Sequence, residues 1–154
     1  TTNVDLVLAM IYTETKGKTD DVMQSSESST GVTNSITDRK ESIRQGVTVL
    51  SENLEEAAHY KVDPWTAVQA YNIGKGYIDY VADNGGVNTV GLAKAYSKNV
   101  VAPSLGNASG ETYTYYQPVA MYYGGGKLYT NGGNIYYAKE VQLNLFLMRI
   151  FSRL

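Results

Sequence analysis

The pattern of apolar and polar positions predicts a chain made mostly of helices. An apolar run from Val4 to Tyr12, interrupted by one acid, predicts a first helix over residues 4–15. This helix is apolar on all sides, so we expect it to lie buried at the centre of the fold with the other helices packed around it. The sequence Glu14-Thr15-Lys16-Gly17 predicts its C-terminal end, because glycine readily adopts the left-handed conformation that closes a helix.

Apolar residues three or four positions apart predict the remaining helices. Ser35 can cap a long second helix whose buried face comprises Ile43, Val47, Leu50, Leu54 and Ala58. Further helices are expected from Asp63-Pro64 to Tyr71, over residues 77–82, from the cap residue Thr89 to Tyr96, and from Ala138 onward. Between the first two helices, residues 17–34 are rich in Ser, Thr, Asp and Gly, which predicts a loop. We expect this loop to belong to a functional site.

The segment from Pro103 to Tyr137 has a different character. It contains eight of the chain's 14 tyrosines and two glycine clusters, and its pattern fits either a long loop or a β-hairpin. The segment is too aromatic for disorder, so its tyrosines either line a binding surface or pack an irregular lobe. The expected fold is therefore mainly α, with a core helix and an irregular lobe that can hold a small β-sheet.

Composition limits the classes of function. With 154 residues and no internal repeat, residues 1–154 are expected to form a single domain. The chain has no cysteine and a single histidine, His59, which excludes disulfides, thiolate zinc sites and multi-histidine metal centres. No metal or organic cofactor is implied. The 13 basic and 15 acidic residues give a net charge of −2, which disfavours nucleic-acid binding.

The apolar runs also bear on the relation to membranes. None of them approaches the roughly 20 residues of a membrane span. The chain begins at Thr1, within the pattern of an apolar helix. We therefore expect it to be a processed or excised piece whose anchor or secretion signal lay upstream.

Glu14 is the residue whose position says most about chemistry. A carboxyl group at the C-terminal end of an apolar helix is desolvated and lies at the negative pole of the helix dipole, and both effects disfavour its ionised form. Such a group can stay protonated near neutral pH. A glycosidase needs a proton donor of this kind for the departing glycosidic oxygen.

Four segments of the chain match, in order, the motifs of one enzyme superfamily. They are Glu14-Thr15, Asp21-Val22-Met23-Gln24, Ala70-Tyr71-Asn72-Ile73-Gly74 and Gly133-Asn134-Ile135-Tyr136-Tyr137. Over its whole length the chain resembles the goose-type lysozyme and lytic transglycosylase superfamily. More specifically, it resembles the lysozyme-like (muramidase) domain of bifunctional cell-wall hydrolases from Gram-positive bacteria. It departs from the family pattern at Asp21, where the family has Gly, and at Asn134, where the family has Asp.

This resemblance implies a substrate and a set of site residues. The implied reaction is cleavage of peptidoglycan glycan strands at the β-1,4 bond between N-acetylmuramic acid and N-acetylglucosamine, with Glu14 as general acid. Glu27 is the candidate second carboxylate, ahead of Asp20, Asp21 and Asp38. The residues expected to contact the substrate offer hydroxyls, amides and flat aromatic faces to sugars; they are Thr15, Gln24, Ser25, Tyr71, Asn72 and Tyr137.

Two other interpretations stay open at this point. A lytic transglycosylase would use Glu14 first as acid and then as base, and would close a 1,6-anhydro ring on the muramic acid. A non-catalytic wall-binding module would keep the sugar-binding residues without turnover. All three interpretations involve contact with peptidoglycan, so we expect the protein to be extracellular or to face the cell wall. Any further targeting would come from a wall-hydrolase or anchoring module elsewhere in the full-length protein.

Overall fold

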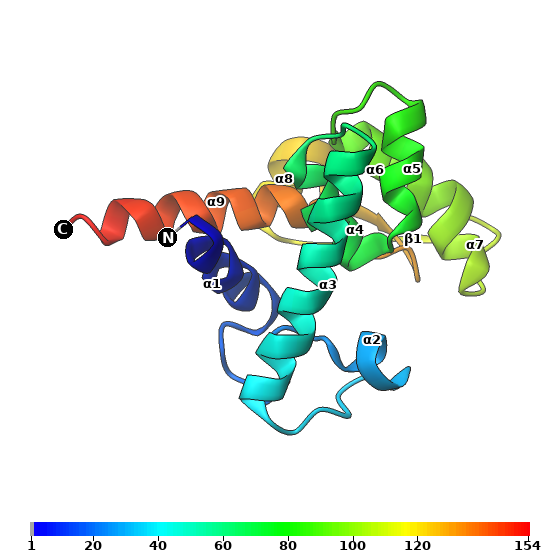
Figure 1. The fold of residues 1–154 in the computed structure, drawn as a ribbon. Coiled ribbons are helices and arrows are strands. Elements are labelled where there is room, and N and C mark those ends of the chain that lie inside the picture. Colours follow the sequence, from blue (N-terminus) through cyan, green and yellow to red (C-terminus); the bar gives the residue numbers. More distant parts are fainter. Residues whose placement is uncertain (1) are drawn as a thin grey trace. The chain divides into compact units, whose positions relative to one another are not determined.

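The computed structural model of the protein describes residues 2–154, and most of these residues lie in helices (Figure 1). A two-stranded antiparallel sheet is present in addition. The prediction of a mainly α fold with a small β element is therefore confirmed. The chain groups into two compact units, the first comprising the residues up to Glu52 together with Glu140–Leu154, and the second comprising Asn53–Lys139.

The first unit is built from two complete helices and parts of two others. These are α1 (Thr2–Thr15), α2 (Ser26–Thr30), the first part of α3 (Arg39–His59) and most of α9 (Tyr137–Phe151). Helices α1 and α9 lie side by side (Figure 1). Asn144 of α9 donates a hydrogen bond from Nδ2 to Thr13 Oγ1 of α1 at 2.8 Å, which connects the two helices.

Helix α1 is less buried than its sequence predicts. Ala9 and Met10 are fully buried, but Val4, Leu8 and Tyr12 are 62%, 48% and 47% exposed. These three residues are four positions apart and share one face of the helix. The prediction that α1 is buried all round is therefore wrong for this face. Hydropathy reports which surface a helix can bury, and not which of its sides a neighbour covers.

Helix α3 differs from its prediction in its start and in its buried face. Asp38, and not Ser35, caps the helix, because its Oδ1 accepts a hydrogen bond from Glu41 N at 2.9 Å. The predicted face is also offset by one position, since Ile43 and Ala58 are exposed. The buried residues of α3 are Ser42, Gly46, Leu50, Asn53 and Ala57. Several of them are polar or very small, so apolar spacing alone could not identify this face.

The second unit is a helical cluster around one apolar core. It holds the last residues of α3, α4 (Pro64–Ile73), α5 (Gly76–Asp83), α6 (Val90–Tyr96), a π-helical turn (Ser97–Val101) and α7 (Ala102–Ser104). Tyr77, Ile78 and Val81 of α5 are completely buried in this core. The predicted cap of α6 is confirmed, because Thr89 Oγ1 accepts a hydrogen bond from Leu92 N at 3.0 Å.

The tyrosine-rich segment forms a short hairpin with a helix inserted in it. Strand β1 (Thr112–Thr114) pairs antiparallel with β2 (Lys127–Tyr129), and Thr112 lies opposite Tyr129. Helix α8 (Pro118–Gly124) lies between the two strands in the chain. Of the two predicted forms, the β-hairpin is therefore confirmed. Helix α8 was not predicted, because its seven residues show little helical period and, unlike α6 with Thr89, its cap position holds Gln117, which forms no side-chain cap hydrogen bond.

Candidate active site

Glu14 lies at the C-terminal end of α1, as the sequence predicts. Its side chain is partly buried, and the last turn of the helix contains no basic residue. The chain leaves the helix through Lys16 and Gly17, which both have positive φ angles, of 54° and 70°. The carboxyl group therefore lies at the negative pole of the helix dipole, where a negative charge is disfavoured.

Thr15 connects this helix end to the loop that follows. Its hydroxyl donates a hydrogen bond to Val22 O at 2.9 Å and accepts one from Gly17 N at 3.1 Å. The side chain thus fixes the path of the backbone directly beside Glu14. Thr15 as a whole residue is half-buried.

Asp21 is the centre of a hydrogen-bonded cage in the loop. The side chain is only 3% exposed. It accepts hydrogen bonds from Ser26 Oγ at 2.5 Å, Ser42 Oγ at 2.6 Å and Ser25 N at 2.9 Å. Burial raises the pKa of Asp21, but these hydrogen bonds more than offset burial, so that the pKa lies below its ordinary value. A carboxylate held in this way is a structural anion and a poor candidate for a catalytic base.

The loop rests on α3 through Met23. This side chain is fully buried, and Met23 N donates a hydrogen bond to Ser42 Oγ at 3.1 Å. A Cβ atom added to Gly46 would lie 2.6 Å from Met23 Sδ and 2.8 Å from Met23 Cβ. Gly46 is therefore the residue that lets the loop approach the helix so closely.

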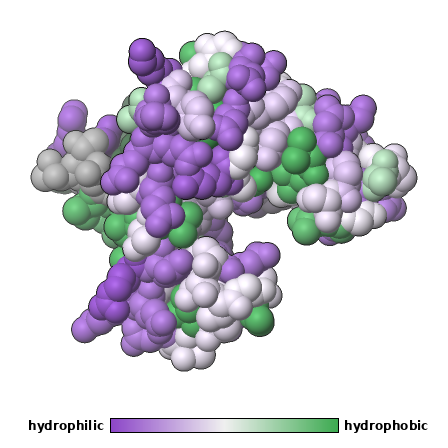
Figure 2. Space-filling model, turned by 45° about the vertical axis from the view of Figure 1, so that its right-hand side comes forward, coloured by the Kyte–Doolittle hydropathy of each residue, from purple (hydrophilic) through white to green (hydrophobic). Residues whose placement is uncertain are grey.

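The other predicted residues of this loop differ in exposure. Gln24 is exposed, has a φ of 49°, and donates from Nε2 to Asp21 O at 3.1 Å. Ser25 is 2% exposed, and its hydroxyl donates to Ser42 O at 2.8 Å, so it supports the loop from inside. Glu27 is exposed in the first turn of α2. The surface around α2, at the bottom of Figure 2, is mostly pale, which means near-neutral hydropathy. This agrees with its content of Ser and Thr.

In the second unit, two segments some 60 residues apart in the chain come together. Asn72 Oδ1 accepts a hydrogen bond from Asn134 N at 2.7 Å. Gln69 is 1% exposed and donates from Nε2 to Asn134 O at 2.8 Å, while its Oε1 accepts from Ala138 N at 3.1 Å. A Cβ atom on Gly133 would lie 3.0 Å from Asn72 Oδ1. The close fit of this turn against α4 therefore depends on glycine.

Tyr71 and Tyr137 lie next to each other in this second group. Their rings are nearly parallel, with an angle of 9° and centroids 6.3 Å apart. Tyr137 is buried at the start of α9, and Tyr71 is half-buried on α4. The predicted residues Tyr71, Asn72 and Tyr137 therefore form one cluster.

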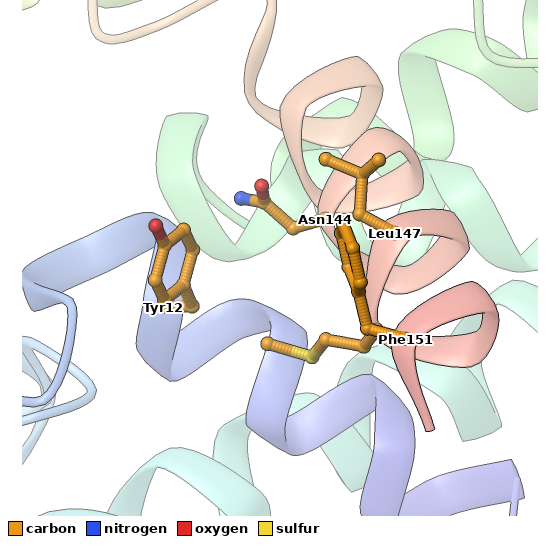
Figure 3. A pocket seen from close by; sticks show the side chains of 5 residues that line it. Tyr12, Asn144, Leu147 and Phe151 are labelled. Carbon is orange, nitrogen blue, oxygen red and sulfur yellow. The ribbon is translucent and has the colours of Figure 1, made fainter. Parts of the chain in front are cut away.

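A separate pocket of about 280 Å³ opens between α1 and α9 (Figure 3). Its lining is mainly apolar and consists of Tyr12, Asn144, Leu147, Met148 and Phe151. Tyr12 and Glu14 are two residues apart, which places them about 200° apart around the helix axis. The pocket thus opens on a different side of α1 from Glu14, and its lining contains no acid. It is not the site of the candidate proton donor.

The described residues form neither a metal-binding cluster nor a helix that could span a membrane. Within residues 2–154, no group of three or more His, Asp or Glu side chains is arranged to hold a metal ion. In the same part of the chain, no helix combines the length and the apolar character needed to cross a bilayer.

Several residues that shape the site were missed from the sequence. The sequence marks Asp21 only as a weaker candidate for the second carboxylate, and its bonds to Ser25 and Ser26, four and five positions on, do not follow the usual spacing of a helix cap. Gln69 precedes the Ala70–Gly74 segment and gave no signal. Ser42 and Gly46 gave a weak one, as small residues four positions apart on a helix.

Comparison with known proteins identifies the class. The chain belongs to the lysozyme-like family, whose profile matches residues 1–145. It is 66% identical over 150 residues to the pneumococcal vaccine antigen A homolog of Streptococcus pyogenes serotype M1, covering 97% of this chain and 75% of that protein.

Two further matches are more distant. The chain is 40% identical over 95 residues to the bifunctional muramidase/DL-endopeptidase CwlT of Bacillus subtilis, which covers 62% of this chain and 28% of that protein. Among solved structures, it is similar to a lipoprotein-like protein of the NLP/P60 family from Staphylococcus aureus, with a TM-score of 0.81 and 35% identity. That match covers 94% of this chain and 46% of the other.

Proposed function

We propose that this protein cleaves the glycan strands of peptidoglycan at the β-1,4 bond between N-acetylmuramic acid and N-acetylglucosamine, with Glu14 as the general acid. The observation that carries the proposal is the position of Glu14. It is partly buried in the last turn of α1, at the negative pole of the helix dipole. Such a position favours a carboxyl group that keeps its proton until a leaving oxygen takes it. Membership of the lysozyme-like family and the similarity to a muramidase support this assignment.

The remaining site residues receive roles that follow from their contacts. We assign Gln24, Tyr71, Asn72 and Tyr137 to binding of sugar hydroxyl, ring and N-acetyl groups. Thr15 holds the backbone beside the acid, and this half-buried residue can also meet the substrate. Ser25 is assigned to positioning of the loop, because its hydroxyl is used inside it.

The reaction can follow two routes after the first proton transfer. In both, Glu14 protonates the glycosidic oxygen and the bond from this oxygen to the muramic acid C1 breaks. In a hydrolase, water attacks C1, and a second carboxylate, for which we propose Glu27, takes the proton of the water. In a lytic transglycosylase, the C6 hydroxyl of the same muramic acid attacks C1, and the ionised Glu14 takes its proton.

The first test is Glu14→Gln, which keeps the shape of the side chain and removes the transferable proton. We expect clearing of purified peptidoglycan to fall by at least about a hundredfold, the range typical of general acid catalysis. Thermal stability should stay near wild type or rise. The exposed Glu52→Gln on α3 is the matched control and should clear normally. Substantial clearing by Glu14→Gln would remove the assignment.

The second test separates the two routes. Mass spectrometry of the released muropeptides distinguishes reducing ends from 1,6-anhydro ends. If Glu27 activates water, Glu27→Gln should lower the rate of hydrolysis strongly and the products should be reducing. Anhydro products with a normal rate for Glu27→Gln would instead establish the transglycosylase route.

A non-catalytic wall-binding role is the competing proposal. Relatives that are 57% to 66% identical to this chain carry names that describe antigens and no activity. Binding to peptidoglycan with no soluble sugar released at any pH would favour this role over cleavage. In either case peptidoglycan lies outside the cytoplasmic membrane, so we place the protein at the cell surface or in the wall.

A further inference from the structure

The segment around α8 exposes an unusual concentration of tyrosine. Tyr116 and Tyr122 are 80% and 83% exposed, and Tyr113 and Tyr123 are 49% and 46% exposed. Tyr113 lies in β1, Tyr116 lies between β1 and α8, and Tyr122 and Tyr123 lie on α8. The rings of Tyr122 and Tyr123 touch edge to face, with centroids 4.9 Å apart. Large aromatic surfaces left in water on a protein commonly mark a binding surface.

These tyrosines stand on a rigid frame. Tyr115 N donates to Gly126 O at 2.7 Å, and Gly126 N donates to Ala120 O at 3.0 Å. The hydroxyl of the buried Tyr136 donates to Lys127 O at 2.9 Å. Gly126 has a φ of 73°, and a Cβ atom there would lie 2.6 Å from Tyr115 O. The backbone that presents the rings is thus fixed from several sides, which lowers the entropy cost of binding.

The charge of the segment is also distinct from that of the whole chain. The net charge is −2, yet no Asp or Glu occurs between Glu111 and Glu140. Two lysines, Lys127 and Lys139, lie in this interval, and Lys139 Nζ is 5.3 Å from the centre of the Tyr123 ring. The exposed tyrosines therefore lie in a segment that does not repel an anionic ligand.

We propose that Tyr116, Tyr122 and Tyr123 form a platform that binds peptidoglycan strands without taking part in bond cleavage. This inference rests on the proposed function. Tyrosine offers a flat apolar face together with a hydroxyl, and so matches a sugar ring, which has apolar C–H faces and a polar rim. The nearby lysine fits the carboxylates of the peptide stems. We define this set of three residues as the tyrosine platform.

The test measures binding without turnover. All variants carry Glu14→Gln, and the ligand is insoluble peptidoglycan from a Gram-positive wall, stripped of covalently attached anionic polymers by hydrofluoric acid. We expect the double change Tyr116→Ala and Tyr122→Ala to weaken binding by about tenfold, because two stacking faces are lost. Tyr122→Phe keeps the face and should bind within about twofold of its parent. Tyr60→Ala, an exposed tyrosine outside the platform, is the control and should bind normally.

Two results would overturn the proposal. One is unchanged binding of the double variant to stripped peptidoglycan while its thermal stability matches that of the parent. The other is a platform effect seen only with unstripped walls, which would assign the tyrosines to anionic wall polymers. Failure of the proposed function would appear separately, as clearing activity retained by Glu14→Gln.

Discussion

Asp21 organises the loop that follows α1. Hydrogen bonds reach its carboxylate from the backbone and hydroxyl of Ser26, from the backbone of Ser25 and from the hydroxyl of Ser42. Two of these donors begin α2 and one belongs to α3. The buried carboxylate of Asp21 therefore connects the start of α2 and helix α3 to the loop that follows Glu14. This loop and α2 carry Gln24 and Glu27.

We predict that Asp21→Asn destabilises the fold by roughly 2 to 3 kcal/mol, the range for losing charge-assisted hydrogen bonds to a buried group. The new amide has the same size, but its NH₂ group would face donors. Urea unfolding of the variant and of Asp20→Asn, an exposed neighbour, would measure the effect. An equally small loss of unfolding free energy in both variants would contradict the role of Asp21.

The same carboxylate predicts a dependence on pH. Its pKa is lower in the folded protein than the ordinary value of 3.8, so the ionised form favours folding. Its contribution is fully present above that ordinary value and is lost as the pH falls through the lowered folded-state pKa. The difference in unfolding free energy between wild type and Asp21→Asn should thus be constant above about pH 5 and narrow below pH 3.8. A difference that widens on acidification would contradict this explanation.

At the scale of elements, Gly46 explains how the loop and α3 fit together. Glycine inside a helix costs up to about 1 kcal/mol relative to alanine. Here the absent side chain leaves room for Met23, whose Sδ and Cβ would both lie under 3 Å from an added Cβ. The packing of the loop therefore depends on a residue that is unfavourable for the helix itself.

We predict that Gly46→Ala lowers both stability and activity. Overpacking costs roughly 1 to 3 kcal/mol, which the gain in helix propensity offsets only in part. Activity should fall because Met23 must move, and Gln24 with it. Gly91→Ala on α6 is the matched control, since its nearest contact would be an ordinary 3.8 Å and the helix should gain stability. Thermal denaturation and clearing assays would measure stability and activity in both variants. A Gly46→Ala variant that is more stable than wild type and fully active would show that the loop does not need glycine at this position.

The elements that the sequence predicted well are those specified by local signals. The helices α4, α5, α6 and α9, and the cap at Thr89, follow from apolar spacing and from cap residues. The face of α3 and the exposure of Val4 and Leu8 depend on which segments pack there, and that information is spread along the chain. For the same reason, the position of Glu14 at a helix end could be predicted, whereas the cage around Asp21 could not.

At the scale of the molecule, two helices are shared between the compact units. Helix α3 runs through the boundary at Glu52 and Asn53, and α9 runs through the one at Lys139 and Glu140. Helix formation is cooperative along its length, so loss of either unit should fray both helices. We therefore propose that the chain behaves as a single domain.

We therefore predict one cooperative unfolding transition for the whole chain. In differential scanning calorimetry, the calorimetric and van't Hoff enthalpies should agree. The same should hold for the Asp21→Asn variant, with a lower transition temperature. Two resolved transitions, or a calorimetric enthalpy well above the van't Hoff value, would show that the units unfold independently.

The residues with positive φ angles are natural positions for stabilising substitutions. Among residues 2–154, the non-glycine residues in the left-handed region are Lys16, Gln24, Asn34, Lys61 and Asn131. A left-handed conformation costs a side chain-bearing residue about 1 to 2 kcal/mol, so a search for thermostable variants would place glycine at such turns. At Lys61 the exchange to glycine should raise stability without a loss of function. At Gln24 the same exchange would remove the side-chain amide that we propose binds substrate, so a screen that ranks variants by melting temperature alone would select against the proposed function.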